Sequence, residues 1–309
     1  MKLSVVVPVY NEEESIQSFF QELMIHLPEL ASSYEVIFVD DGSTDTSLEL
    51  LQKLDKENKH VKVYSFRRNN GKAEALHFGF QKAGGDLIVT LDADLQDQPI
   101  EIKKLLEKYN EGVDVVCGWR KDRKDKSKMK FISKIFNFFV HKAFEINVHD
   151  YNCGLKLYSS DAAKSIRLYG GLHRFIPVLV KEQGFSVDEV AVEHQPRKFG
   201  TSKYGFSKIF KDLPDMFTML FLVKYRQKPL HFFGLIGGLS LLGGFFILTY
   251  LTFIKLSGES IGGRPLLFLG VLLFVVGVQI FLTGFLAELI LSVSQKEKTL
   301  PKLRYPTEK

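Results

Sequence analysis

Apolar residues in the first 120 positions fall into short continuous runs separated by longer segments of helical periodicity. The runs predict buried strands over residues 3–9, 35–39, 61–66, 86–91 and 113–117. Between them, apolar residues recur every three or four positions, as at Phe19, Leu23 and Leu27, and predict helices; Asn11 with Glu14 forms a candidate capping box for the first. Alternating strands and helices predict an α/β domain with a mostly parallel sheet.

Two later segments have a different pattern, with no charged residue over 25 positions (230–254) and again over 23 (265–287). Either segment is long enough to cross a bilayer as a helix. Two core helices of a soluble protein are the alternative, but uncharged runs of this length are unusual there. The pattern therefore predicts a transmembrane hairpin of helices at about 230–254 and 265–291. Gly234 and Gly238 form a small-residue pair that would let these helices approach.

Charge is uneven along the chain, although the formal net charge is only +5 and the mean hydropathy is zero. Residues 119–142 and 195–228 are strongly basic, and a basic amphipathic pattern at about 128–145 overlaps the first of these stretches. Such patterns are typical of helices on anionic membrane surfaces, although a solvated basic face of a globular helix has the same pattern. Nucleic-acid binding is the weaker interpretation, since a membrane already accounts for the basic residues, and no nucleic-acid partner is expected.

The predicted organisation is a catalytic domain over 1–205, a juxtamembrane amphipathic helix over 206–229, the hairpin over 230–291 and a basic tail over 292–309. Lysine and arginine flank the hairpin more densely than they occupy its link at 255–264. The positive-inside rule therefore predicts an integral membrane protein with two spans, whose catalytic domain and both termini are cytoplasmic. The hairpin could also support a homo-oligomer.

Polar and acidic residues follow the predicted strands, where α/β sheets bind ligands. Asp92-Ala93-Asp94 comes after the fourth strand, with Gln96 nearby and Asp40-Asp41 after the second. Two adjacent carboxylates and an amide oxygen suit Mg²⁺ or Mn²⁺, which commonly bind one or two carboxylates together with substrate phosphates. A solvated turn is the alternative for any single Asp-x-Asp. The chain lacks G-x-G-x-x-G after its first strand, a P-loop, G-x-S-x-G, H-E-x-x-H and zinc-ligand spacing.

Three motifs, Val6-Val7-Pro8-Val9-Tyr10-Asn11-Glu12, Val39-Asp40-Asp41-Gly42-Ser43-Thr44-Asp45 and Leu91-Asp92-Ala93-Asp94-Leu95-Gln96, resemble those of the family 2 inverting glycosyltransferases. The nearest branch is the dolichol-phosphate-mannose synthase-like, or GtrB-type, polyprenyl-phosphate glycosyltransferases with a membrane hairpin. The resemblance extends through Asp150-Tyr-Asn-Cys-Gly154, His173-Arg174 and residues 196–205. It implies a GT-A fold, which is Rossmann-like, and transfer of a sugar from a nucleotide diphosphate to polyprenyl phosphate.

The resemblance also implies roles for individual residues. Those expected to bind the nucleotide, phosphates or acceptor are Pro8, Tyr10, Glu12, Asp41, Lys72, Asp92, Lys130, Ser133 and Ser202. The metal ligands it implies are Asp92, Asp94 and Gln96. The residues it places at the reacting centre are Arg120, Asp150, Arg197 and Lys203. Lys130 stands where the family has arginine, and lysine offers a point charge instead of a bidentate fork.

The chemistry of the acceptor leaves the role of Asp150 open. A lipid phosphate monoester, with a second pKa near 6, is largely ionised at pH 7, so a strong base is not required. Asp150 is either a base or a group that orients basic side chains, and the second role is favoured. UDP-glucose is the preferred donor, with GDP-mannose as the alternative. A processive polysaccharide synthase is disfavoured because Q-x-x-R-W is absent, and a non-catalytic nucleotide-binding membrane protein because the acidic motif is intact.

Overall fold

The computed structural model describes residues 1–121, 146, 148–195, 218, 221, 225 and 228–294. The chain divides into two units, Met1–Met219 and Leu220–Lys309, which are considered separately.

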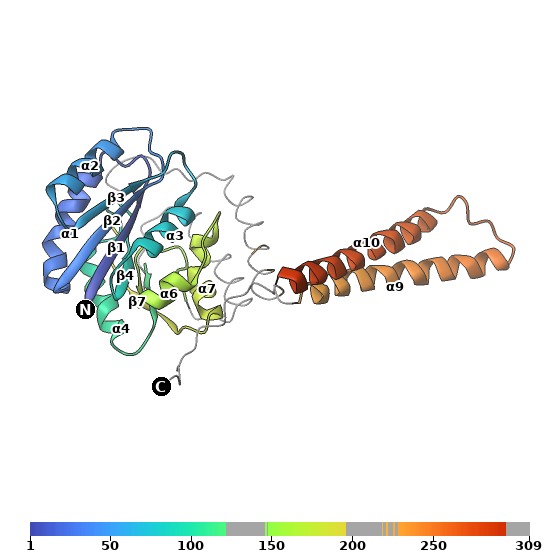
Figure 1. The fold of residues 1–309 in the computed structure, drawn as a ribbon. Coiled ribbons are helices and arrows are strands. Elements are labelled where there is room, and N and C mark those ends of the chain that lie inside the picture. Colours follow the sequence, from blue (N-terminus) through green and yellow to red (C-terminus); the bar gives the residue numbers. More distant parts are fainter. Residues whose placement is uncertain are drawn as a thin grey trace. The chain divides into compact units, whose positions relative to one another are not determined.

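The first unit is built on a seven-stranded sheet with the order β3-β2-β1-β4-β6-β5-β7 (Figure 1). Its strands are β1 (Lys2–Val9), β2 (Ser33–Asp40), β3 (Val61–Ser65), β4 (Leu87–Thr90), β5 (Val115–Trp119), β6 (Lys156–Ser159) and β7 (Val187–Ala191). Only β6 runs antiparallel to its neighbours, β4 and β5. The predicted α/β class with a mostly parallel sheet is therefore confirmed.

Helices cover both faces of this sheet (Figure 1). They are α1 (Ile16–Leu30), α2 (Ser47–Glu57), α3 (Lys72–Lys82), η1 (Pro99–Glu101), α4 (Ile102–Tyr109), α6 (Ser160–Ser165), η2 (Leu172–Phe175) and α7 (Ile176–Glu182). The apolar faces of α1, α2 and α4 share one core with alternate residues of β1, β2 and β4. Helix α3 packs on the opposite face, where Gly79 leaves space for the side chain of Val6.

Two features of this unit differ from the pattern-based predictions. Strands β6 and β7 were not predicted, because β6 is only four residues long and β7 reads Val-Asp-Glu-Val-Ala, without a continuous apolar run. The predicted capping box is wrong, since α1 begins at Ile16 with Ser15 as its N-cap residue. Asn11 instead adopts a left-handed conformation and pairs with the loop after β2.

The second unit contains two long apolar helices, α9 (Pro229–Leu256) and α10 (Pro265–Ser294) (Figure 1). Over Pro229–Leu256 and Pro265–Val293 they are long and apolar enough to cross a membrane, with peak mean hydropathies of 2.0 and 2.6. In the most apolar 18-residue segment of each helix, only 11% is buried. The side chains there mostly face outward, as lipid contact requires. Glu288 of α10 accepts a hydrogen bond from the backbone N–H of Leu230 in the first turn of α9.

Glycines spaced seven residues apart line the contact between α9 and α10. They are Gly237 and Gly244 on α9, and Gly270, Gly277 and Gly284 on α10. A Cβ on Gly237 would lie 2.7 Å from the backbone nitrogen of Phe281, so the two backbones approach closely there. The prediction that Gly234 and Gly238 make the close approach is wrong, because a Cβ on Gly238 would meet nothing within 4 Å.

Candidate functional site

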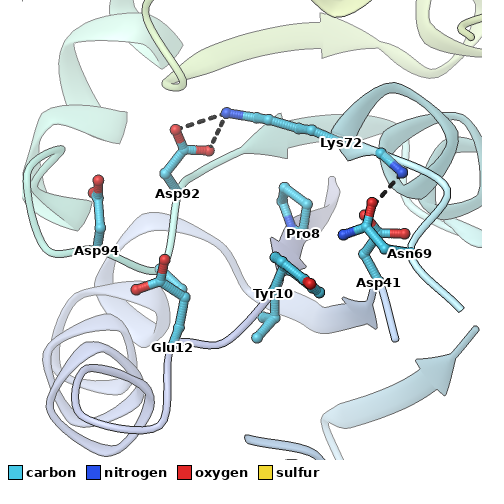
Figure 2. Close-up of a pocket in the computed structure, with 11 residues that line it drawn as sticks. Pro8, Tyr10, Glu12, Asp41, Asn69, Lys72, Asp92 and Asp94 are labelled. Atoms are coloured by element: carbon cyan, nitrogen blue, oxygen red, sulfur yellow. Dashed lines mark hydrogen bonds and ion pairs between the residues drawn. The ribbon is translucent and has the colours of Figure 1, made fainter. Parts of the chain in front are cut away.

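A cavity of about 330 Å³ lies at the carboxyl ends of the parallel strands (Figure 2). Seven residues predicted from the sequence line it: Pro8, Tyr10, Glu12, Asp41, Lys72, Asp92 and Asp94. The parallel sheet brings them together because the loops after β1, β2, β3 and β4 all leave it at the same edge. Asn69 and Gly71 also line the cavity, and neither was assigned an individual role from the sequence. Both residues follow the third predicted strand, and that position was the available sequence signal for them.

Asp41 builds one wall of the cavity through its hydrogen bonds. Its two carboxylate oxygens accept from the backbone N–H groups of Asn70 and Gly71, at 2.7 and 2.9 Å. Burial raises the pKa of Asp41, the two N–H donors oppose that shift, and the charge of Asp40 adds to it. Gly42 has φ +70, and a Cβ there would lie 2.5 Å from the backbone of Arg68. The loops after β2 and β3 are thus held together at the start of α3.

The loop after β1 is fixed against the loop after β2 in a similar way. The side-chain oxygen of Asn11 accepts from the backbone N–H of Thr44 at 2.8 Å, and the Asn11 N–H donates to Ser43 Oγ at 3.0 Å. The backbone N–H of Glu12 donates to Ser47 Oγ at 2.9 Å. Tyr10 and Glu12 are therefore presented to the cavity from a loop whose backbone is firmly held.

Asp92 forms an ion pair with Lys72 in the cavity. Lys72 Nζ lies 2.5 and 2.7 Å from its two carboxylate oxygens (Figure 2). Burial alone would raise the pKa of Asp92, but the charge and hydrogen bonds of Lys72, and then the charges of Lys156 and Arg120, hold that pKa below its usual range. Asp92 therefore remains ionised at neutral pH.

The next turn of this loop shapes the candidate metal site. Leu95 has φ +59, an uncommon conformation for a branched residue, and the backbone N–H of Gln96 donates to Asp94 Oδ1 at 3.2 Å. Asp92 and Asp94 line the cavity, and Gln96 follows on the same loop. The carboxylate oxygens and the amide oxygen are hard donors, so these residues fit Mg²⁺ or Mn²⁺. Lys72 already balances Asp92 by charge, so a cation at this site would share or replace that contact.

Arg120 and Asp150 form a bidentate ion pair in the same domain. Arg120 Nε donates to Asp150 Oδ2 at 2.7 Å and Nη2 to Oδ1 at 3.0 Å, with side chains only 10% and 6% exposed. Burial would lower the pKa of Arg120, but the hydrogen bonds and charge of Asp150 raise it. The guanidinium is thus fixed in one plane and permanently charged.

The other predicted site residues lie outside the described part of the chain. They are Lys130, Ser133, Arg197, Ser202 and Lys203.

Four residues around the acidic loop were not assigned from the sequence: Asp97, Gly154, Lys156 and His194. Gly154 is required by packing, since a Cβ there would lie 2.7 Å from Asp92 Oδ2. Lys156 is 3% exposed, and its amine donates to the carbonyl of Cys153. Asp97 and His194 pair with each other. The sequence signals for this group were the position of Asp97, directly after Gln96, and the place of Gly154 at the end of the Asp150–Gly154 motif.

The sequence profile of Glycosyl transferase family 2 matches residues 4–167, more than half of the chain. The chain is 37% identical over 308 residues to dodecaprenyl-phosphate galacturonate synthase of Rhizobium johnstonii, a match that covers 97% of this chain and 91% of the relative. It is 34% identical to undecaprenyl-phosphate 4-deoxy-4-formamido-L-arabinose transferase of Photorhabdus laumondii, and this match covers 97% of this chain and 92% of the relative.

Solved structures with the same fold include glucosyl-3-phosphoglycerate synthase from Mycobacterium tuberculosis in complex with Mn²⁺, uridine diphosphate and phosphoglyceric acid. Its TM-score is 0.54 at 18% identity, over 73% of this chain and 78% of that one. TarS from S. aureus in complex with UDP-GlcNAc has a TM-score of 0.50 at 19% sequence identity, and the match covers 72% of this chain and 67% of that one. The predicted GT-A fold is confirmed. The sequence profile and the near full-length relatives agree with the acidic cavity at the sheet edge, and the chain accordingly belongs to glycosyl transferase family 2 and is a glycosyltransferase.

Proposed function

We propose that this protein transfers a sugar from a nucleotide diphosphate sugar to polyprenyl phosphate at a membrane surface, with inversion at the anomeric carbon. The observation that carries this proposal is the similarity over 97% of the chain to two enzymes named for dodecaprenyl and undecaprenyl phosphate. That span includes both apolar helices, so the likeness is not limited to the donor-binding domain.

The donor is proposed to occupy the cavity at the carboxyl ends of β1 to β4. Pro8, Tyr10, Glu12 and Asp41 are proposed to bind the nucleoside. Lys72, which contacts Asp92 of the acidic loop, would lie near the diphosphate. Asp92, Asp94 and Gln96 would hold Mg²⁺ or Mn²⁺. A bound divalent ion would neutralise the diphosphate and stabilise it as it leaves.

The reaction itself needs no strong base from the protein. An oxygen of the ionised acceptor phosphate attacks C1 of the sugar, the bond from C1 to the diphosphate breaks, and the nucleoside diphosphate leaves with the bonding electron pair. The chain's main task is to bring two anions together. The guanidinium of Arg120, held by Asp150, is proposed to face the phosphates. Arg197 and Lys203 are proposed to bind the acceptor phosphate or the leaving diphosphate, with Lys130, Ser133 and Ser202 as further phosphate contacts.

The donor is proposed to be a UDP-sugar, with UDP-glucose as the preferred one. GDP-mannose is the second candidate, as in dolichol-phosphate-mannose synthases. The protein is proposed to span the membrane twice with the domain and both termini in the cytoplasm, because basic residues concentrate outside the link between α9 and α10.

One assay tests the proposal directly. The full chain in nanodiscs is incubated with undecaprenyl phosphate, Mn²⁺ and, separately, UDP-glucose, UDP-galacturonate, UDP-N-acetylglucosamine or GDP-mannose, and lipid products are identified by mass spectrometry. We expect one UDP-sugar to give a lipid-linked sugar and Asp94→Ala to abolish the product. Asp55→Ala, an exposed carboxylate on α2, serves as the matched control and should retain activity. Absence of a lipid-linked sugar with every donor would overturn the proposal.

A further inference from the structure

We propose that Asp97 and His194 are positioning residues that fix the side-chain amide of Gln96 with its oxygen directed to the divalent cation. The inference rests on the proposed function, in which Gln96 is a metal ligand. It concerns two residues that the motif resemblance leaves without a role.

Asp97 anchors the ring of His194 inside the protein. Their side chains are only 4% and 5% exposed, and Asp97 Oδ1 lies 3.2 Å from His194 Nδ1. The other carboxylate oxygen of Asp97 accepts from the backbone N–H of Leu155 at 3.2 Å. Both oxygens are therefore committed, and the carboxylate cannot rotate without losing a buried hydrogen bond.

This anchor determines which nitrogen of a neutral His194 ring carries the hydrogen. Nδ1 faces a carboxylate, which only accepts, so Nδ1 is the donor and Nε2 is left as an acceptor. His194 Nε2 lies 3.4 Å from the side-chain nitrogen of Gln96, which can donate to it. The amide oxygen of Gln96 then lies on the other side of the amide carbon, directed away from His194.

Without such a partner, a glutamine amide has two nearly equivalent orientations. In one of these orientations the NH₂ group of the amide points to the metal, and an amide NH₂ group cannot act as a metal ligand. Because Nε2 of His194 only accepts, it selects the orientation in which the NH₂ group of Gln96 faces the ring and the amide oxygen faces the metal. Metal sites commonly depend on outer hydrogen bonds of this kind to orient the ligands themselves.

The backbone reinforces the same arrangement. The N–H of Gln195 donates to the carbonyl of Gln96 at 2.9 Å, and Asp97 and His194 form an isolated antiparallel bridge. A Cβ on Gly154 would lie 2.7 Å from Asp92 Oδ2 and 3.0 Å from Asp97 Oδ2. The carboxylate of the metal motif and the carboxylate that holds His194 are thus packed around one glycine.

The competing interpretation is that the pair only ties the segment after β7 to the loop after β4. The two interpretations differ for His194→Asn. Asparagine can still donate to Asp97 from the place of Nδ1, but it has no atom at the place of Nε2. It therefore keeps the anchor and removes only the contact with Gln96.

The experiment measures Mn²⁺ binding by electron paramagnetic resonance on the full chain in nanodiscs, with UDP present. We expect His194→Asn to weaken Mn²⁺ binding by about 10- to 100-fold. The midpoint of thermal unfolding and UDP binding without metal should remain at wild-type values, which a merely structural role would not predict. His60→Asn, the same change at the amino-terminal edge of the sheet beside Tyr34, is the matched control and should leave Mn²⁺ binding unchanged.

A double-mutant cycle with Gln96→Ala completes the test. If His194 acts through Gln96, His194→Asn causes no further loss once Gln96 is alanine. If Gln96→Ala weakens Mn²⁺ binding but His194→Asn does not, or if the two losses add, this inference is overturned and the proposed function stands. If Gln96→Ala leaves Mn²⁺ binding intact, both the inference and the proposed metal role of Gln96 are overturned.

Discussion

At the scale of single residues, the ion pair of Arg120 and Asp150 bears on how the acceptor is activated. Both oxygens of Asp150 are used to hold the guanidinium, in a pair that is almost fully buried. A carboxylate committed in this way is poorly placed to take a proton. This geometry supports the orienting role for Asp150 over the role of a base.

Asp150→Asn should therefore lower kcat/KM by about 100-fold through misplacement of Arg120, without altering the shape of the pH–rate profile. The acidic limb of that profile should persist, because it reports ionisation of the acceptor phosphate near pH 6. Lipid glycosylation measured from pH 5 to 9 checks this. Asp188→Asn, which removes a surface ion pair with Lys108, is the control. Loss of the acidic limb in Asp150→Asn would instead identify Asp150 as the base.

At the scale of elements, Glu35 ties β2 to the strands and loops beside it. It accepts from Lys62, Ser4 and the backbone N–H of Gly84, at 2.7 to 2.8 Å. Burial raises the pKa of Glu35, but these bonds together with Lys2 lower it from 4.5 to about 2. The unfolded chain therefore binds a proton at a higher pH than the folded one, and the stability from Glu35 is lost as pH falls from about 4.5 towards 2.

We expect the wild-type protein to lose about 2 kcal/mol more stability between pH 6 and pH 3 than Glu35→Gln does. Urea unfolding of the solubilised full chain, followed by the fluorescence of Trp119, measures the difference. Glu49→Gln, at an exposed position of α2, should behave like the wild type. Equal pH dependence in wild type and Glu35→Gln would contradict the assignment.

The contact between α9 and α10 gives a second element-scale prediction. Gly237→Val places a side chain against the backbone of Phe281 and Gly277, so it should destabilise the hairpin by about 1 to 3 kcal/mol. Gly238→Val, one position along the same helix and facing open space, should have almost no effect. Unfolding of the solubilised chain by titration with a denaturing detergent compares the two. Similar midpoints for both variants would show that the glycine contact does not stabilise the pair.

At the scale of the whole molecule, the basic segments and the hairpin are expected to act together. A polyprenyl tail stays in the bilayer, so the enzyme must work where the lipid phosphate meets water. The hairpin would confine it to that surface, and the basic stretch at 128–145 would attract anionic lipid.

Deleting residues 229–294 and replacing Lys130, Lys134 and Lys142 by glutamine should release the protein into the soluble fraction and abolish transfer to polyprenyl phosphate. UDP binding should persist, since the donor cavity is formed by the sheet edge. Fractionation, calorimetric UDP titration and lipid product analysis together check this. Unchanged membrane association and lipid glycosylation would contradict the expected role of these segments.

Much of the fold follows from local patterns in the chain. The runs that form β1 and β2 and the uncharged segments that form α9 and α10 are recognisable because burial or lipid contact must be satisfied within a few consecutive residues. The acidic motif after β4 is recognisable because parallel strands end at one edge. The strands β6 and β7 are not, since four or five mixed residues become strands only through pairing with β4 and β5.

The sequence by itself determined the alternation of elements, the membrane-length helices, the family and the residues that come to the sheet edge. The tertiary structure decided which partner each of these side chains contacts. Asp41 binds backbone amides, Asp150 holds Arg120, and His194 reaches Gln96 from 98 positions away. Those contacts join residues distant in the chain, and no local periodicity or motif spacing can encode a hydrogen bond whose partner is chosen by the packing of the whole domain.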